Sequence, residues 1–317
     1  MTPPTAAPTL AHVTPETVAR LALDRLDTFM SFESAVLRGD DPDAIHDIRV
    51  ASRRLQQALD LLYLKPRPRV IARLRKRLRK ARRSLSVLRN CDVLLALVEK
   101  SLKRSRHKGR ARAWRATQEL LSQQRVRELR KAHKRLAKIR LDRFYLALRA
   151  TLDEYAQTAA KDEALRQEFP ARVQASLQQT WQGFEDSVDA AIKDPTVAHA
   201  ARIAAKKFRY LVEVVDACGA SGAHEVLRWL RRIQTSLGDW HDRVVLENAL
   251  VETIAQPNLI RKHPEDVRTL LTLIERTRNR ASGHLEHFLE LARPQARHSA
   301  DSWVKSVRTA AAQPASA

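Results

Sequence analysis

The sequence predicts an all-α protein built from two related halves. Glycine is scarce, with 7 in 317 residues, and long segments rich in Leu, Ala, Arg, Lys, Glu and Gln repeat their apolar residues at helical spacing. Hydrophobic residues make up 44% of the chain, which is enough to bury a sizeable core. A third observation, the recurrence of two sequence blocks in the second half of the chain, predicts an internal duplication.

The first two helices are predicted from their start signals. Thr14 is a good N-cap followed by proline at the first helical position, and the helix is expected to run toward Arg38. A Gly-Asp-Asp segment then interrupts the helical pattern. Asp41 caps the next helix, which again has proline at its first position.

The start of this second helix recurs later in the chain. HDIRVASRRL begins at His46 and HAARIAAKKFRYLVE begins at His199, a separation of 199 − 46 = 153 residues. A later block recurs with Asp92 of RNCDV matching Asp242 of LGDWHD, a separation of 242 − 92 = 150 residues. A shorter connection in the second copy, at 218–222, explains the difference. Each half is therefore expected to hold about four helices, which gives two tandem four-helix bundles.

The domain boundaries follow from the duplication. The first helical half is expected at about 13–160 and the second at about 161–295. The flanking segments, 1–12 and 296–317, have the composition of mobile tails.

The charge balance indicates a polyanionic partner. Lys+Arg number 58 against 36 Asp+Glu, a formal net charge of +22, which suits nucleic acid, an anionic membrane surface or a chain of phosphates. Cys91 and Cys218 are far apart and in no CxxC motif, so neither a disulfide framework nor a thiolate zinc site is expected. No metal and no other cofactor are predicted. No signal peptide or membrane span is recognisable, which predicts a soluble cytoplasmic protein.

Basic stripes on the duplicated helices are the candidate binding surface. At 100° per residue the basic side chains fall on one side of each helix and the apolar side chains on the other. Cations about one turn apart suit a linear phosphate chain, and arginine donates bidentate hydrogen bonds to phosphate. A merely solvated face is the alternative for one stripe, but its recurrence favours binding. The stripes contain His46, Arg49 and Arg53 in the first half, and His199, Arg202 and Lys206 in the second.

Further candidates flank these stripes or follow them in sequence. Whether the two histidines contact the ligand or are structural stays open at this stage. The very basic segment at 125–143 either extends the binding surface or promotes solubility. The additional predicted ligands are Arg54 and Lys207 beside the stripes, Lys76, Arg79, Lys80 and Arg83 on the helix that follows the first stripe, and Arg228, Arg231 and Arg232 on its counterpart.

The recurring blocks resemble the signature blocks of the CHAD family, the conserved histidine α-helical domain. They lie at 46–55, 89–93, 199–213 and 237–242, in the family's order, and the resemblance covers about 14–295. It implies two four-helix bundles related by pseudo-two-fold symmetry, a basic central channel or groove, and binding of inorganic polyphosphate, often at polyphosphate granules. It also places the family histidines at His46 and His199 and adds Arg209 to the ligands. Gln56 stands where the second half has Arg209, so the halves are expected to contribute unequally.

Two alternatives remain beside polyphosphate binding without catalysis. Nucleic acid is compatible with the charge, but aromatics make up only 5% of the chain and do not interleave with the basic stripes. An HD-type metal phosphohydrolase is suggested by His46-Asp47 and His241-Asp242, yet neither dipeptide recurs in the other half. Membrane-surface binding is disfavoured because the basic helices lack an opposed Trp/Phe-rich face. The sequence leaves the oligomeric state open.

Overall fold

A computed structural model describes residues 10–307, apart from the side chains at 258, 260 and 262, and the described part of the chain is helical with no β-strand. The predicted all-α class is therefore confirmed. The helices are α1 (Pro15–Ser31), α2 (Glu33–Arg38), α3 (Pro42–Leu62), α4 (Arg69–Ser84), α5 (Ser86–Lys103), α6 (Lys108–Ala137), α7 (Leu141–Ala159), α8 (Glu163–Lys193), the 3₁₀ turn η1 (Pro195–Val197), α9 (Ala198–Ala217), α10 (Ala223–Ile254), α11 (Pro257–Lys262), α12 (Pro264–Leu291) and α13 (Pro294–Ser306).

The predicted N-caps are present at the starts of α1 and α3. The hydroxyl of Thr14 accepts a hydrogen bond from the backbone N–H of Thr17 at 3.2 Å, and the Asp41 carboxylate accepts one from the N–H of Asp43 at 2.8 Å. The expectation of one helix from Thr14 toward Arg38 is wrong, because α1 ends at Ser31 and α2 begins two residues later. Apolar spacing continues across this break, so periodicity alone gave no sign of it.

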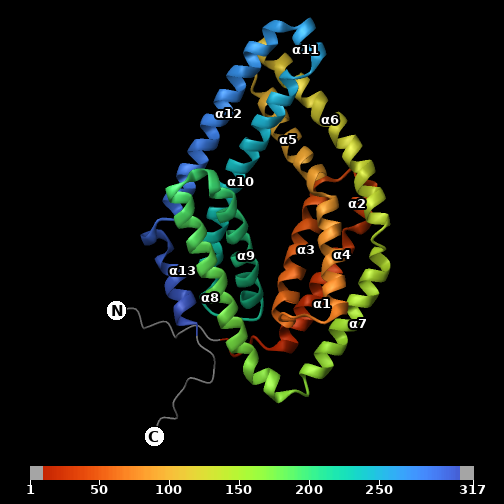
Figure 1. Cartoon of the computed structure of the whole chain (residues 1–317), viewed down its shortest axis with the longest axis vertical. Helices are drawn as coiled ribbons and strands as arrows, with labels where there is room; N and C mark the ends of the chain where they lie inside the picture. The colour runs from red at the N-terminus through yellow and green to blue at the C-terminus, as the bar shows by residue number, and fades with distance from the viewer. Residues whose placement is uncertain (1–9, 308–317) are drawn as a thin grey trace.

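The helices form an elongated molecule with two sides (Figure 1). α1 to α4 and α7 lie along one side, and α8, α9, α10, α12 and α13 lie along the other. The two sides meet at one end, here called the distal end, where α5 and α6 pack against α10 and α12. They also meet in the middle, where α3 packs against α9.

The larger hydrophobic cluster joins the two sides near α3 and α9. Phe29 of α1 packs edge-on against Phe144 of α7, with ring centroids 6.0 Å apart. On the other side Trp181 of α8 lies 5.2 Å from Phe208 of α9, again between ring centroids. These residues belong to one contiguous cluster that contains buried side chains from both predicted halves. Burial of this apolar surface fixes α3 and α9 relative to each other.

A smaller hydrophobic cluster lies at the distal end. Its buried members include Leu94 of α5, Trp114 of α6, Leu250 of α10 and Leu270 of α12. It too combines residues from before and after position 160, where α7 connects to α8. The helices of the two predicted halves are thus packed against each other at two separate places along the molecule.

The ends of the chain are more ordered than expected. Residues 296–306 belong to α13, which is buried at Ala300, Trp303 and Val304, and the indole N–H of Trp303 donates to the carbonyl of Ser221 at 2.9 Å. Leu10 is also fully buried. The tail predictions are therefore wrong for residues 10–12 and 296–307, because composition conceals a few well-spaced apolar residues. Residues 1–9 and 308–317 lie outside the described part of the chain.

Candidate anion-binding site

Six basic side chains from four helices come together between α3 and α9. α3 packs against α4, α5 and α9, so a side chain on its inner face meets three neighbours. Arg53 is central, because it acts electrostatically on arginines of α3, α4 and α9 and on Lys206. All six side chains are half-buried. This central cationic cluster consists of Arg49 and Arg53 of α3, Arg82 of α4, Arg89 of α5, and Arg202 and Lys206 of α9.

Neutral groups hold the arginines of the cluster in place. Arg49 Nη1 donates to the carbonyl of Arg82 at 2.6 Å and to Ser86 Oγ at 2.8 Å. Arg82 Nη1 donates to Gln56 Oε1 at 3.0 Å. Among the described residues, no carboxylate oxygen lies within 4.0 Å of the charged nitrogens of the cluster. The hydrogen bonds orient the side chains, and the carboxylate of Asp242 on α10, beyond 4.0 Å, offsets only part of the positive charge.

Burial and mutual repulsion make this concentration of charge unfavourable. Burial, with the nearby guanidinium of Arg53, lowers the pKa of Arg49 to about 9. The pKa of Lys206 falls to about 7, first because the ammonium is buried and then because Arg202, Arg53 and Arg49 surround it. The Nε of Arg202 is buried and makes no hydrogen bond with any described group. An anion in this position would relieve the repulsion and supply the missing acceptor.

Histidines of α3, α9 and α10 lie near the cluster. His46 and His199 are exposed near the starts of α3 and α9. The part of the His46 imidazole that is removed from water, followed by the charge of Arg89, lowers its pKa, so the ring is mainly neutral at pH 7. His241 of α10 lies 5.6 Å from His199 between ring centroids, and burial lowers its pKa to about 4. Neutral imidazoles can add hydrogen-bond donors at the rim without adding charge.

Arg54 and Arg209 lie outside the central cationic cluster and bind a shared carboxylate, that of Glu213. Arg54 Nε contacts one oxygen of Glu213 at 2.7 Å, and Arg209 Nε contacts the other at 2.8 Å. Arg209 also donates to Gln234 Oε1 at 2.6 Å. We call Arg54, Arg209 and Glu213 the carboxylate latch, since it joins α3 to α9. The single carboxylate of Glu213 offsets part of the charge on these two arginines, whereas among the described residues no carboxylate lies within 4.0 Å of the central cationic cluster.

The expected inequality between Gln56 and Arg209 has a clear structural form. Gln56 of α3 accepts a hydrogen bond from Arg82 of the next helix, whereas Arg209 of α9 donates one to Gln234 of the next helix. Both halves therefore have an arginine–glutamine hydrogen bond between two successive helices. The arginine is on the second helix of the pair in the first half and on the first helix of the pair in the second half. Only the first-half arrangement directs its arginine into the central cationic cluster.

The other predicted ligands lie on separate surfaces. Lys207 faces a hollow that also contains Asp60 and two arginines paired with it, Arg67 and Arg75. Arg231 lines the hollow next to the carboxylate latch. The remaining predicted ligands are all exposed side chains, namely Lys76, Arg79, Lys80 and Arg83 on α4, and Arg228 and Arg232 on α10.

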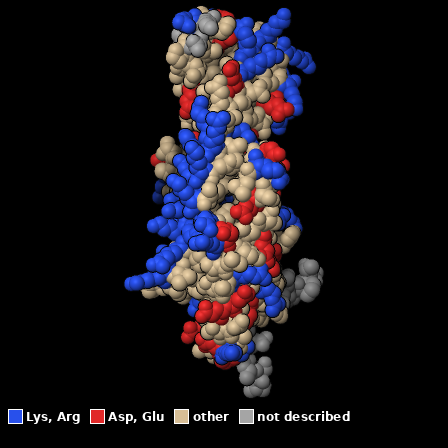
Figure 2. Space-filling view, turned by 90° about the vertical axis from the view of Figure 1, so that its right-hand side faces the viewer, with Lys and Arg blue, Asp and Glu red and all other residues tan. Residues whose placement is uncertain are grey.

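Exposed cations also form a band on the outside of the molecule. Figure 2 shows Lys and Arg gathered in a continuous stretch on the face that carries α6 and α7. Beneath it, Lys80 and Arg83 of α4 line a hollow of about 670 Å³ together with Arg135, Lys138 and Arg143. This outer basic band, defined by exposed cations of α4, α6 and α7, could accept a polyanion extending beyond the central cluster.

Sequence reasoning missed Arg82 and Arg89 as members of the cluster. Arg82 and Arg89 are seven residues apart, a spacing that favours one face of a continuous helix, but they lie on separate helices, since α4 ends at Ser84 and α5 begins at Ser86. The more numerous cations between them pointed to an exposed face instead. Helix packing, rather than local charge density, decides which arginines turn inward.

Possible metal ligands occur away from the cluster. Among the described residues, His263, Glu265 and Asp266 form the single group of three that could share an ion. Their carboxylates already bind Arg112, whose Nη2 lies 2.7 Å from Asp266 Oδ1 and 3.0 Å from Glu265 Oε1. Neither His46-Asp47 nor His241-Asp242 belongs to this group. The donor set at Glu265 and Asp266 is explained by an ion pair that ties α6 to α12.

The arrangement of helices and the sequence both match known proteins. The family profile of the CHAD domain matches residues 20–251. The crystal structure of the CHAD domain from the plant Ricinus communis has a TM-score of 0.61 at 23% identity, covering 96% of this chain and 94% of that chain. PptA from Streptomyces chartreusis has a TM-score of 0.60 at 16% identity, covering 87% of this chain and 98% of that chain.

These solved structures share the fold of the chain. No curated protein sequence is significantly similar to it. Within the described residues, no helix has both the length and the apolar character needed to cross a bilayer. The profile match extends over most of the chain, including both recurring blocks that border the central cationic cluster. The protein therefore belongs to the CHAD domain family.

Proposed function

We propose that the protein binds inorganic polyphosphate at the central cationic cluster and catalyses no reaction there. The observation that carries this proposal is the convergence of six half-buried cations from α3, α4, α5 and α9, whose charge is offset only in part by Asp242. A folded protein retains such repulsion at a cost in stability, and a bound polyanion removes that cost. Membership of the CHAD family supports the choice of phosphate, because the resemblance of the recurring blocks implies polyphosphate binding.

The chemistry of the cluster suits a fully ionised phosphate chain. Guanidinium and ammonium groups only donate hydrogen bonds, and phosphate oxygens of the chain only accept them. Arg53 and Lys206 have no hydrogen-bond partner among the described residues, so their donors are available to a ligand. The site needs no covalent step to retain a polyanion.

Nucleic acid fits the cluster less well than polyphosphate does. Bases bound without sequence preference usually stack on aromatic side chains that face the ligand. The described residues of α3 include no aromatic side chain, and the two on α9, Phe208 and Tyr210, are buried. The cluster therefore offers phosphate contacts without stacking platforms. Nucleic acid remains the second candidate because the outer basic band could bind its backbone.

A double variant tests the binding proposal. Arg53→Ala combined with Lys206→Ala removes two cations that hold no other group in place, so the fold should persist and the affinity for long-chain polyphosphate should fall by about 100-fold or more. Arg228→Ala with Arg232→Ala is the matched control, since it removes two basic side chains from the exposed surface of α10. Isothermal titration calorimetry at fixed salt measures both, and circular dichroism checks helicity.

The same titration distinguishes the alternatives. Competition by an oligonucleotide of equal charge at equal affinity would favour nucleic acid as the principal ligand. Release of phosphate from polyphosphate by the purified protein with added divalent metal would overturn the non-catalytic assignment. We further propose that polyphosphate binding places the protein at cytoplasmic polyphosphate granules, which colocalisation of a fluorescent fusion, with and without the double substitution, would test.

A further inference from the structure

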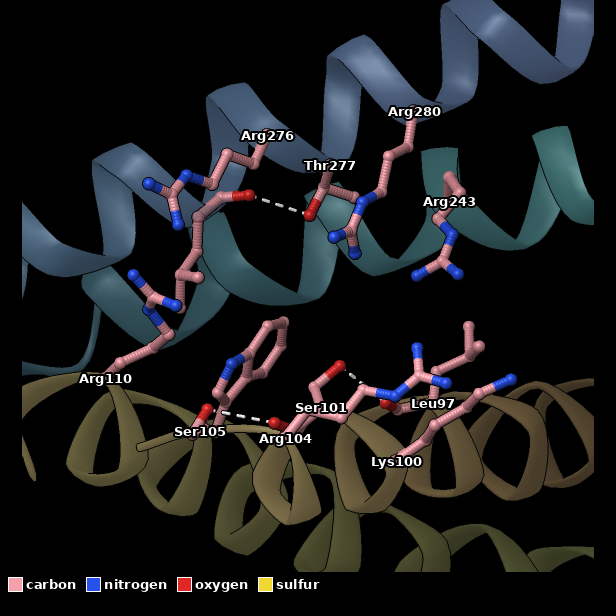
Figure 3. Close-up of a pocket in the computed structure, with 12 residues that line it drawn as sticks. Leu97, Lys100, Ser101, Arg104, Ser105, Arg110, Arg243, Arg276, Thr277 and Arg280 are labelled. Atoms are coloured by element: carbon pink, nitrogen blue, oxygen red, sulfur yellow. Dashed lines mark hydrogen bonds between the residues drawn. The ribbon is translucent and has the colours of Figure 1, made fainter. Parts of the chain in front are cut away.

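A second group of unpaired cations surrounds a small hollow at the distal end. The hollow has a volume of about 150 Å³ and lies between the α5/α6 pair and the α10/α12 pair. Figure 3 shows basic side chains from both pairs directed into this space. No acidic residue lines it. The six cations, here called the distal cationic pocket, are Lys100, Arg104, Arg110, Arg243, Arg276 and Arg280.

Carboxylates in this region are directed to other arginines. On α12, Arg278 pairs with Glu247 at 2.6 Å, and on α6, Arg112 pairs with Asp266 at 2.7 Å. Among the described residues, no ion pair or side-chain hydrogen bond involves any of the six pocket cations. The same helices thus neutralise the arginines that face away from the hollow and leave those that face into it charged.

The guanidinium groups are the main hydrogen-bond donors that the pocket offers to a ligand. Hydroxyl groups of Ser101 and Thr277 donate to carbonyls of their own helices, at 2.8 Å and 2.7 Å, so the guanidinium groups remain the donors for a ligand. Arg243 is half-buried, and its pKa is lowered by burial and then by the neighbouring charge of Arg280. Trp114, which is 5% exposed, forms an apolar wall. Repulsion between guanidinium groups on such a rigid support favours an anion between them.

Carboxylates separate this pocket from the central cationic cluster. The hollow that adjoins both of them shares Lys100 with the distal pocket and contains Arg89 of the cluster. It is also lined by four acidic residues, which are Asp43, Asp92, Glu99 and Asp242. Asp92 is paired with Arg125 and Glu99 with Lys103, so a phosphate chain following this path would meet the carboxylates of Asp43 and Asp242. The distal cationic pocket is therefore a distinct site and not a continuation of the first.

We propose that the distal cationic pocket is a second anion site, which binds a short oligophosphate such as pyrophosphate or triphosphate. Its volume of about 150 Å³ suits a small anion, and the six cations around it suit a ligand with several negative charges close together. Six donors converging from two helix pairs suit a compact group with oxygens on every side. This inference does not depend on the ligand of the central cationic cluster.

Calorimetric titration with inorganic triphosphate tests the second site. Arg243→Ala with Arg280→Ala removes one pocket guanidinium group from α10 and one from α12 (Figure 3), and we expect the affinity of the distal site for triphosphate to fall at least tenfold. Arg278→Ala is the matched control, because it removes a cation from the same helix that is paired outside the hollow. Unchanged triphosphate binding by the double variant overturns the proposal.

Two further measurements control for misfolding of the first variant and for binding of triphosphate at the central cationic cluster. Lys100→Ala with Arg276→Ala changes only exposed pocket residues and should also weaken triphosphate at least tenfold. Arg53→Ala with Lys206→Ala should retain distal triphosphate binding while losing long-chain polyphosphate. If that variant loses all triphosphate binding, no distal site exists. If the distal variants bind triphosphate more weakly but bind long-chain polyphosphate as the wild-type protein does, the result supports two sites. If they bind both ligands more weakly to the same extent, ends of the long chain also occupy the distal cationic pocket.

Discussion

The protonation of Lys206 gives the sharpest prediction about the central cationic cluster. Burial and the charges of Arg202, Arg53 and Arg49 lower its pKa from an ordinary value of 10.5 to about 7, with Asp242 acting weakly in the opposite direction. A bound phosphate chain adds negative charge beside the ammonium and returns the pKa toward its ordinary value. Binding above pH 7 must therefore take up a proton at Lys206.

The size of the effect follows from linkage between protonation and binding. With a pKa of about 7, Lys206 is half-protonated at pH 7 and about one-tenth protonated at pH 8 in the free protein, so polyphosphate affinity should fall about fivefold over that interval. The affinity falls as the pH rises because the free protein loses the Lys206 proton that the complex keeps. Neither His46, whose pKa is lowered, nor Arg49, whose pKa is about 9, changes its charge appreciably over this range.

Calorimetry in buffers of different ionisation enthalpy measures the proton uptake directly. At pH 8 the wild-type protein should take up about 0.9 proton for each central site filled. Lys206→Arg keeps the charge at all these pH values, so its affinity should change less than twofold between pH 7 and 8. Lys207→Arg is the control, since Lys207 faces another hollow. Equal pH dependence in the wild-type protein and Lys206→Arg would refute the reasoning.

Three other outcomes follow from the same structure. The logarithm of polyphosphate affinity should decline linearly with the logarithm of salt concentration, and Arg53→Ala should make that slope shallower by about one, as titrations at several salt concentrations would reveal. Glu213→Gln should weaken the carboxylate latch and lower the free energy of unfolding by about 1–3 kcal/mol in urea denaturation, leaving the central cluster charged. Trp303→Ala should cost about 3–5 kcal/mol by the same assay, because α13 then loses its buried anchor; no loss would mean that α13 contributes little to the core.

The all-α class was predictable because the sequence signals for helices, such as N-caps, depend on neighbouring residues. The cap at Thr14 and the cap at Asp41 depend on a few adjacent residues, and both appear as expected. The folded segment around Trp303 was not predictable from composition, since three or four apolar side chains at the right spacing suffice to dock a short helix. Leu10 illustrates the same point at the other end of the chain.

The candidate site was only partly predictable because it depends on packing between distant helices. Helical periodicity placed Arg49, Arg53, Arg202 and Lys206 on the faces that the structure brings together. It could not show that Arg54 and Arg209 share the carboxylate of Glu213, because Arg54 lies on a helix far from Glu213 in sequence. The distal cationic pocket was missed entirely, since its cations come from four helices.

Placing so much unneutralised charge between two helices requires a compensating structure, and the carboxylate latch supplies part of it. Glu213 bridges Arg54 of α3 and Arg209 of α9, while Arg25 of α1 donates to the carbonyls of Arg54 and Glu213, at 2.9 Å and 3.4 Å. The hydrophobic cluster around Phe208 holds the same helices from the other side. The contacts that stabilise α3 against α9 are thus separate from the cations proposed to bind phosphate. This separation lets the cluster remain charged and open to a ligand without weakening the junction that positions it, and a bound polyanion would add its own binding free energy to the stability of the fold.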